Sequence, residues 1–182
     1  MPRIHAVRHG AASAGFGDDA DPGLSDEGRA QAALVADTFA ALDPRPILVS
    51  PLRRCRETAA PLEARWGIAA VVDHAIAEVA APSSDLEERS IWLRGALVSN
   101  WSVLEDGPRA WRDALLARVA AVEVDTVLVT HFVVVNAFIG AATGDDRVMI
   151  ERLANGSCTV FDVDGGTLRL VTAGVDGPSE VL

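Results

Sequence analysis

The sequence has no lysine, no tyrosine and only two cysteines, and each shortage excludes a class of chemistry. Without lysine, the chain has neither a Walker-type phosphate loop nor an amine that could form a Schiff base. Cys55 and Cys158 lie far apart in sequence, so we expect reduced thiols in a cytoplasmic protein. No apolar run approaches the ~18 residues that a membrane-spanning helix needs, and we expect no secretion signal.

Basic charge is also scarce, because the net charge is −10 and all sixteen basic residues are arginines. This balance argues against nucleic acid or an anionic membrane as the main partner, since those surfaces attract basic proteins. A small anionic substrate remains compatible, because it needs only a few arginines gathered in one pocket. The length of 182 residues predicts a single domain over 1–182, and the sequence does not indicate the oligomeric state.

Short apolar segments alternate with helix-like segments along most of the chain. We expect strands at residues 3–8, 47–50, 69–72 and 126–130, and helices at residues 25–42, 52–66, 108–121 and 133–142. This alternation predicts an α/β three-layer sandwich, with a mostly parallel central sheet and helices on both faces. Two further strands at 157–163 and 168–172, joined by an Asp-Gly-Gly turn, predict a C-terminal β-hairpin.

Two segments lack a clear period. Residues 11–23, rich in alanine, glycine and aspartate, predict a loop. Residues 79–112 predict a small cap insertion, made of a loop and one or two helices over the mouth of the site. In open parallel sheets, ligands bind beyond the carboxyl ends of the strands, so this edge is where we expect the site.

His9 follows the first predicted strand directly, within Arg8-His9-Gly10. A neutral imidazole is a good nucleophile at phosphorus, and a glycine beside it lets the backbone approach an anion closely. A histidine that only caps the strand is the structural alternative. His5 and His9 would lie ~13 Å apart on a strand, which is too far for one metal ion. A metal hydrolase is therefore poorly supported.

Two other cationic or polar groups follow predicted strands. Arg53, Arg54 and Arg56 begin the second helix, where a guanidinium can clamp a phosphate near the positive helix end. Spacing alone does not choose among these three arginines. His131 follows an apolar strand and precedes an apolar helix, so it needs a polar partner. That partner is either a phosphate oxygen or a backbone carbonyl.

Transfer of a phosphoryl group also requires an acid that protonates the leaving oxygen and later activates water. Glu78 lies shortly after the third predicted strand and is one choice, because a partly buried carboxyl does this well. Asp73, Glu87 and Glu88 are rivals.

These segments together resemble the histidine phosphatase superfamily, also called the phosphoglycerate mutase-like family. Arg8-His9-Gly10 resembles the family signature, and Val129-Thr130-His131 resembles the motif of its second histidine. Three further segments match the family in its order: Leu24-Ser25 through Gln31-Ala32, Ser50 through Ala59, and Ala77-Glu78-Val79. The second of these three is similar to "S-x-L-x-R-A-x-x-T-A", which selects Arg54 from its neighbours. The turn Asn155-Gly156-Ser157 also resembles the turn that precedes the family's closing strand.

The resemblance implies a phosphoglycerate mutase-like fold and a catalytic mechanism. It implies that His9 attacks phosphorus and becomes phosphohistidine, and that Glu78 acts as general acid and then general base. It implies that Arg8, Arg54 and His131 surround the phosphoryl oxygens. Ser13 would add a hydroxyl contact to the substrate. No metal and no organic cofactor are expected.

Three departures from the family pattern bear on the reaction. Phe132 replaces the glycine that often follows the second histidine, Ala11-Ala12 replaces the commoner Glu-Thr, and Glu78 lacks the usual "D-x-G" after it. These departures weaken an assignment to the sugar-phosphate mutases, and the short cap favours hydrolysis. We therefore expect a metal-independent phosphatase acting on a small or peptide-borne phosphomonoester. The alternatives are a phosphoglycerate mutase-type phosphotransferase and a non-catalytic phosphate-binding module.

Overall fold

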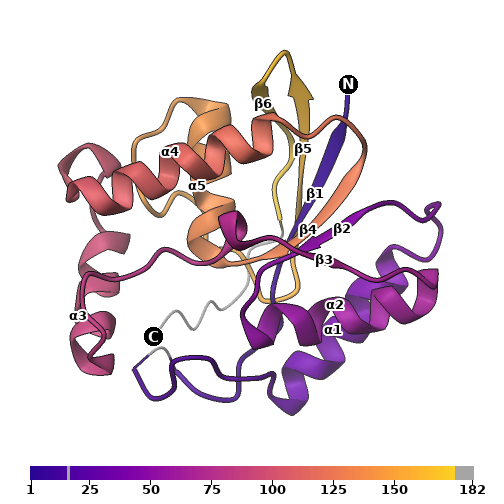
Figure 1. The fold of residues 1–182 in the computed structure, drawn as a ribbon, viewed down its shortest axis with the longest axis horizontal. Helices are drawn as coiled ribbons and strands as arrows, with labels where there is room; N and C mark the ends of the chain where they lie inside the picture. Colours follow the sequence, from indigo (N-terminus) through magenta and orange to yellow (C-terminus); the bar gives the residue numbers. More distant parts are fainter. Residues whose placement is uncertain (16, 175–182) are drawn as a thin grey trace.

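The computed structural model describes residues 1–15 and 17–174. Within them, a six-stranded sheet of order β3-β2-β4-β1-β5-β6 forms the middle of the molecule (Figure 1). Its strands are β1 (Arg3–Arg8), β2 (Ile47–Val49), β3 (Val71–Val72), β4 (Thr126–Thr130), β5 (Cys158–Asp164) and β6 (Thr167–Thr172). The first four pair in parallel, whereas β5 is antiparallel to both β1 and β6. The predicted sheet and its C-terminal hairpin are confirmed.

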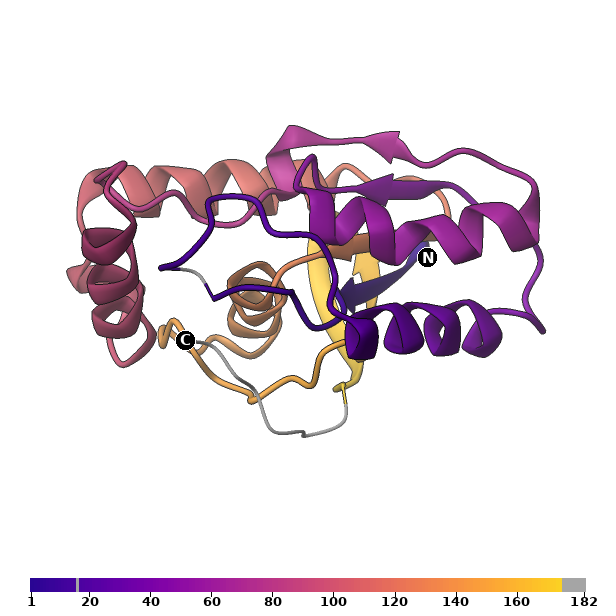
Figure 2. The same cartoon turned by 90° about the horizontal axis from the view of Figure 1, so that it is seen from below.

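Helices cover both faces of this sheet, as predicted (Figures 1 and 2). They are α1 (Asp26–Thr38), α2 (Arg53–Trp66), α3 (Leu86–Leu97), α4 (Asp106–Ala120) and α5 (Phe132–Thr143), with short 3-10 helices η1 (His74–Ile76) and η2 (Trp101–Val103). None of the helices in the described part of the chain is long and apolar enough to cross a membrane.

The period of two along β1 divides the apolar core into two layers. Ile4 and Ala6 point to one face, where they pack in the cluster that includes α4 and α5. Val7 points to the other face, in the cluster that includes α1 and α2. Alternate side chains of a strand lie on opposite faces, so one short strand serves both layers. This burial on both sides fixes the position of the residues that follow β1.

Several predicted boundaries were wrong by a few residues. The strand predicted at 69–72 is reduced to β3, whose two valines are largely exposed at the edge of the sheet. The helix predicted from Pro108 begins two residues earlier, at Asp106. Pro108 fits within the first turn, because the N–H groups there have no partner inside the helix. The helix predicted to reach residue 42 ends at Thr38 and continues as turns.

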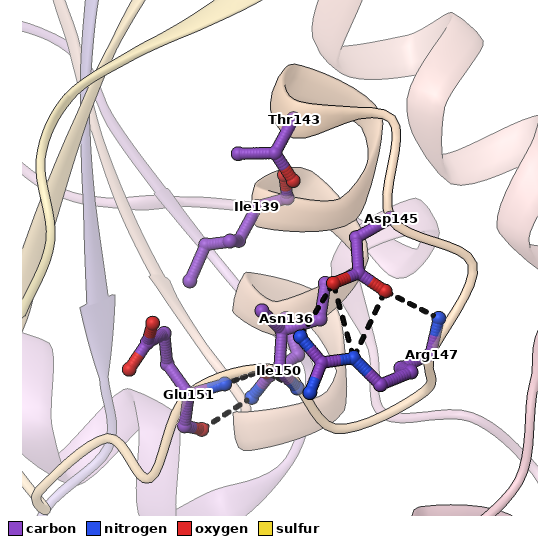
Figure 3. A network of polar contacts seen from close by, with 7 residues as sticks. All are labelled: Asn136, Ile139, Thr143, Asp145, Arg147, Ile150 and Glu151. Atoms are coloured by element: carbon purple, nitrogen blue, oxygen red, sulfur yellow. Dashed lines mark hydrogen bonds and ion pairs between the residues drawn. The ribbon is translucent and has the colours of Figure 1, made fainter.

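Asn136, buried inside α5, holds the following segment against the helix (Figure 3). Its Oδ1 accepts hydrogen bonds from the backbone N–H groups of Ile150 and Glu151, both at 2.8 Å. Its Nδ2 donates to the carbonyls of Phe132 at 3.1 Å and Glu151 at 3.2 Å. The segment then runs to Leu153, whose carbonyl accepts a hydrogen bond from Arg8. Asn136 thus positions a contact of the site from a distance.

We expect Asn136→Ala to lower the free energy of unfolding by about 2–4 kcal/mol, because it leaves buried backbone groups without partners. Urea unfolding followed by circular dichroism measures this change. Asn100→Ala, at an exposed position, is the matched control and should shift stability by less than ~0.5 kcal/mol. Equal stability of the two variants would show that the Asn136 network contributes little.

Candidate active site

A cavity of about 590 Å³ opens beyond the carboxyl ends of the parallel strands, where the sequence placed the site. Its lining includes five of the six predicted site residues: Arg8, His9, Ser13, Arg54 and Glu78. The sixth, His131, is fully buried behind the wall, with its ring centroid 5.2 Å from that of His9. The structure therefore brings the predicted residues together, with His131 behind the others.

The His9 ring is held in one tautomer. Its Nδ1 lies 2.7 Å from the carbonyl of Gly10, and Arg54 Nε donates to its Nε2 over 3.1 Å. A carbonyl can only accept and a guanidinium can only donate, so Nδ1 carries the proton and Nε2 presents its lone pair. Burial, together with the charges of Arg54 and Arg8, lowers the pKa of His9 well below its usual value. His9 is therefore a neutral base whose unprotonated nitrogen, Nε2, accepts from Arg54.

Arg54 lies at the start of α2 and is almost fully buried. Besides His9, its Nη2 donates to Nδ1 of His131 over 3.2 Å. One guanidinium thus joins two imidazoles that are 122 residues apart in sequence. Among the three arginines that begin this helix, Arg53 pairs with Glu57 over 2.6 Å and Arg56 is exposed, so only Arg54 points into the site.

His131 is held in the opposite tautomer. Because its Nδ1 accepts from Arg54, its Nε2 carries the proton and donates to the Ser50 hydroxyl over 2.7 Å. Burial and the charge of Arg54 lower the pKa of His131 well below its usual value, so this ring is neutral too. The polar partners that the structure gives His131 are therefore a serine and an arginine, rather than a backbone carbonyl.

Arg8 contributes a second cation to the cavity wall. It donates to the carbonyl of Leu153, and its guanidinium lies 5.0 Å from the centre of the Phe132 ring. Burial lowers the pKa of Arg8 to about 10, and Arg54 acts in the same direction against the attraction of Glu78. Arg8 still carries its charge at neutral pH. Phe132, where the family often has glycine, thus packs against Arg8 and lines the cavity.

Glu78 is the carboxyl group within this wall. Its Oε2 accepts from the backbone N–H of Val133, in the first turn of α5, over 3.4 Å, and Oε1 accepts from Val79 over 3.1 Å. Burial raises the pKa of Glu78, although Arg54 and Arg8 and both N–H groups favour the ionised form. The rivals lie elsewhere: Asp73 pairs with Arg118, and Glu88 bonds Ser83.

The backbone that follows His9 packs directly on the start of α1. The Ser25 hydroxyl caps α1 by accepting from Gly28 N–H over 3.0 Å, and Gln31 Oε1 accepts from Ala11 N–H over 2.7 Å. A side-chain Cβ at Gly10 would lie 2.5 Å from the Gly28 carbonyl oxygen. The motif that begins at Leu24 therefore has a structural task, which is to hold the loop beside His9.

Two residues that support His9 were not predicted to act on it. The Thr58 hydroxyl accepts from Gly10 N–H over 3.0 Å while donating to the Arg54 carbonyl over 2.7 Å. Asn155 Nδ2 donates to the His9 carbonyl over 3.1 Å and also lines the cavity. Both belong to the motifs quoted above, so the signal was present, but only the folded chain shows what they touch.

Within the described ranges, no three His, Cys, Asp or Glu side chains gather closely enough to hold a metal ion. Cys55 lies against His131, with Sγ 3.4 Å from Nε2. Burial raises the pKa of the Cys55 thiol far above its usual value, so this sulfur is an inert part of the core.

Comparison with known proteins bears on the family and the fold. Residues 4–92 match the family model of the histidine phosphatase superfamily (branch 1), and the fold extends the likeness over the rest of the chain. The resemblance to the histidine phosphatase superfamily is thereby confirmed. An uncharacterized protein of Mycobacterium tuberculosis, Rv0525, is 37% identical over 115 residues, which are 61% of this chain and 49% of that protein. The chain thus spans about half the length of the curated relatives that it matches.

Two solved structures share the superfamily fold at low identity. Bacillus stearothermophilus YhfR has a TM-score of 0.76 and 19% identity, with 98% of this chain and 99% of that chain covered. A mycobacterial glucosyl-3-phosphoglycerate phosphatase in complex with VO3 has a TM-score of 0.72 and 23% identity, with 97% of this chain and 100% of that chain covered. The predicted phosphoglycerate mutase-like fold is confirmed.

The two buried neutral histidines predict a pH dependence of stability. A histidine with a lowered pKa in the folded state stabilises the fold above its unfolded pKa of about 6.5 and loses this contribution as pH falls. We expect the stability contributed by each ring to fall by up to about 1.4 kcal/mol per pH unit below that value. Urea midpoints of the wild type and His131→Asn, compared between pH 8 and pH 5, measure the effect. Parallel pH profiles would contradict it.

Proposed function

We propose that the chain is a metal-independent phosphatase that hydrolyses a phosphomonoester through a phosphohistidine intermediate. The observation that carries the proposal is the lone pair of His9 Nε2 at the wall of a cavity that also holds two guanidiniums and a carboxyl with a raised pKa. Nucleophile, charge stabilisation and acid are the parts that phosphoryl transfer needs.

In the first step, His9 Nε2 attacks phosphorus and the ester P–O bond breaks. The phosphoryl oxygens take over the N–H groups of Arg54 that now point to His9, and Arg8 supplies a second cation. The protonated Glu78 gives its proton to the leaving alkoxide, which departs as the alcohol. The imidazole becomes cationic, and its Nδ1–H bond to the Gly10 carbonyl strengthens as the charge develops.

In the second step, water attacks phosphorus while the Glu78 carboxylate takes one of its protons. The P–N bond breaks, and His9 leaves as the neutral imidazole that the site favours. The charge of Arg54 supports this departure, because the guanidinium destabilises an imidazolium beside it. His131 positions Arg54 from behind. Inorganic phosphate and an unchanged enzyme result.

We expect His9→Ala to reduce hydrolysis of 4-nitrophenyl phosphate by at least about a thousandfold, because the nucleophile is lost. Release of phosphate in the presence of EDTA measures it, and His74→Ala, at an exposed position, should keep full activity. Loss of wild-type activity in EDTA would contradict the metal-independent route. Turnover of phosphoglycerate without free phosphate would indicate a phosphotransferase, and vanadate binding without any turnover would indicate a binding module.

We expect Glu78→Gln to lower kcat for an alkyl phosphate by about 10²–10⁴-fold, but for 4-nitrophenyl phosphate by less than about tenfold. An alkoxide needs a proton in order to leave, whereas nitrophenolate does not. Glu88→Gln is the matched control, since its carboxyl is exposed and should affect neither substrate. Equal losses for both substrates would remove Glu78 from the acid role.

A further inference from the structure

We propose that this cavity accepts phosphomonoesters whose alcohol part carries no further anionic group, and that Asp19 and Glu27 enforce the choice. The inference rests on the proposed phosphatase function and concerns the substrate class. It starts from the charges that line the cavity, apart from the residues that handle the phosphoryl group.

Among the residues that the structure describes, two cations line the cavity. All sixteen arginines of the chain are described, and Arg8 and Arg54 alone belong to the lining; Arg89 and Arg94 of α3 lie outside it. Residues 16 and 175–182, which the structure leaves undescribed, include no basic residue. Both lining cations are close to His9, where a single phosphoryl group uses them. A second phosphate or a carboxylate on the substrate would therefore find no cation in this wall.

The outer part of the cavity instead carries negative charge. Asp19 and Glu27 line it from the loop of residues 11–23 and from the first turn of α1. Gln31 Nε2 donates to Glu27 over 3.0 Å, and the backbone N–H of Asp21 donates to Asp19 over 3.0 Å. Both donors are uncharged, so these bonds orient the two carboxylates without neutralising them. A second anion on the substrate would meet two fixed like charges, which repel it.

The remaining wall is mostly apolar. Leu93 of α3, Phe132 of α5, and Pro22 and Ala20 of the loop belong to it. Figure 2 shows the loop extending toward α3, and a Cβ at Gly17 would lie 3.3 Å from that of Ser90 on this helix. Apolar walls favour an uncharged carbon skeleton beside the phosphate. The same wall disfavours a bisphosphate, which a phosphoglycerate mutase must hold.

Three substrates of similar shape test the inference: benzyl phosphate, 4-carboxybenzyl phosphate and the methyl ester of the latter. The ester has nearly the shape of the acid but no second charge, so the pair separates charge from size. We expect kcat/KM for the acid to be roughly fivefold to tenfold below that for the ester at low salt. This ratio of kcat/KM for the methyl ester to kcat/KM for the acid should fall toward one in 0.5 M salt, because salt screens the exposed charges.

The double variant Asp19→Asn/Glu27→Gln preserves both side-chain acceptors and removes both charges. We expect it to bring the ester-to-acid ratio within about twofold, while kcat/KM for the ester hardly changes. Glu123→Gln/Asp164→Asn removes the same charge from exposed positions outside the cavity lining and should leave the ratio unchanged.

The possible results separate the two proposals. If all three phosphate substrates are hydrolysed in a His9-dependent way but 4-carboxybenzyl phosphate reacts as well as its methyl ester, the inference fails. The proposed phosphatase function then still stands. A preference that survives in the double variant overturns the role of Asp19 and Glu27. If none of the esters is hydrolysed, the proposed function fails and this inference fails with it.

Discussion

One buried guanidinium determines the state of the whole site. Arg54 donates to His9 and to His131 from almost complete burial, so neither ring can take a proton without placing two positive charges side by side. The two remaining ring protons then go to Gly10 and Ser50, which fixes the orientation of each ring. A single interaction thereby sets the protonation of residues that follow two different strands.

The same burial governs Glu78. Two cations and two backbone N–H groups draw its carboxyl toward the ionised form, yet removal from water is the larger effect and raises its pKa. This balance depends on how far the carboxyl is removed from bulk water, because desolvation is what opposes the arginines. Phe132, whose ring lies against the Arg8 guanidinium, lines the same cavity as Glu78.

The sequence was informative where a residue's place follows from chain direction alone. His9 and His131 end parallel neighbours in the sheet, so their proximity could be predicted from two short apolar strands. Arg54 could be separated from Arg53 only by the family pattern, because both begin the same helix. That His131 would lie behind the wall was beyond prediction, since it depends on Ser50, which is 81 positions away.

The ends of the strands and the residues that form the cavity wall were harder to predict, for a different physical reason. β3 is short because its valines lie at an exposed sheet edge, where apolar composition alone does not secure pairing. The loop of residues 11–23 has no period to read, and its shape comes from contacts at its ends. Ser13 N–H donates to the Gly23 carbonyl over 2.9 Å, and Ser25 N–H donates to that of Ala11 over 2.9 Å. Such contacts appear only once the chain is folded.

The hydrogen bonds at the two ends of the loop of residues 11–23 separate the residues that handle the phosphoryl group from those that select the substrate. Arg8, His9 and Arg54 are fixed by the sheet and by α2, whereas the charged and apolar groups of the outer wall belong largely to the loop and α3. Gly10 and Gly28 form the border, because a Cβ at Gly28 would lie 2.0 Å from the Ala11 carbonyl oxygen. A side chain there would move the loop and the His9 backbone together. Farther along the loop, the backbone N–H of Arg53 at the start of α2 donates to Asp21 Oδ1 over 2.8 Å. Outer-wall residues that make no such bond can vary while the phosphate site keeps its geometry.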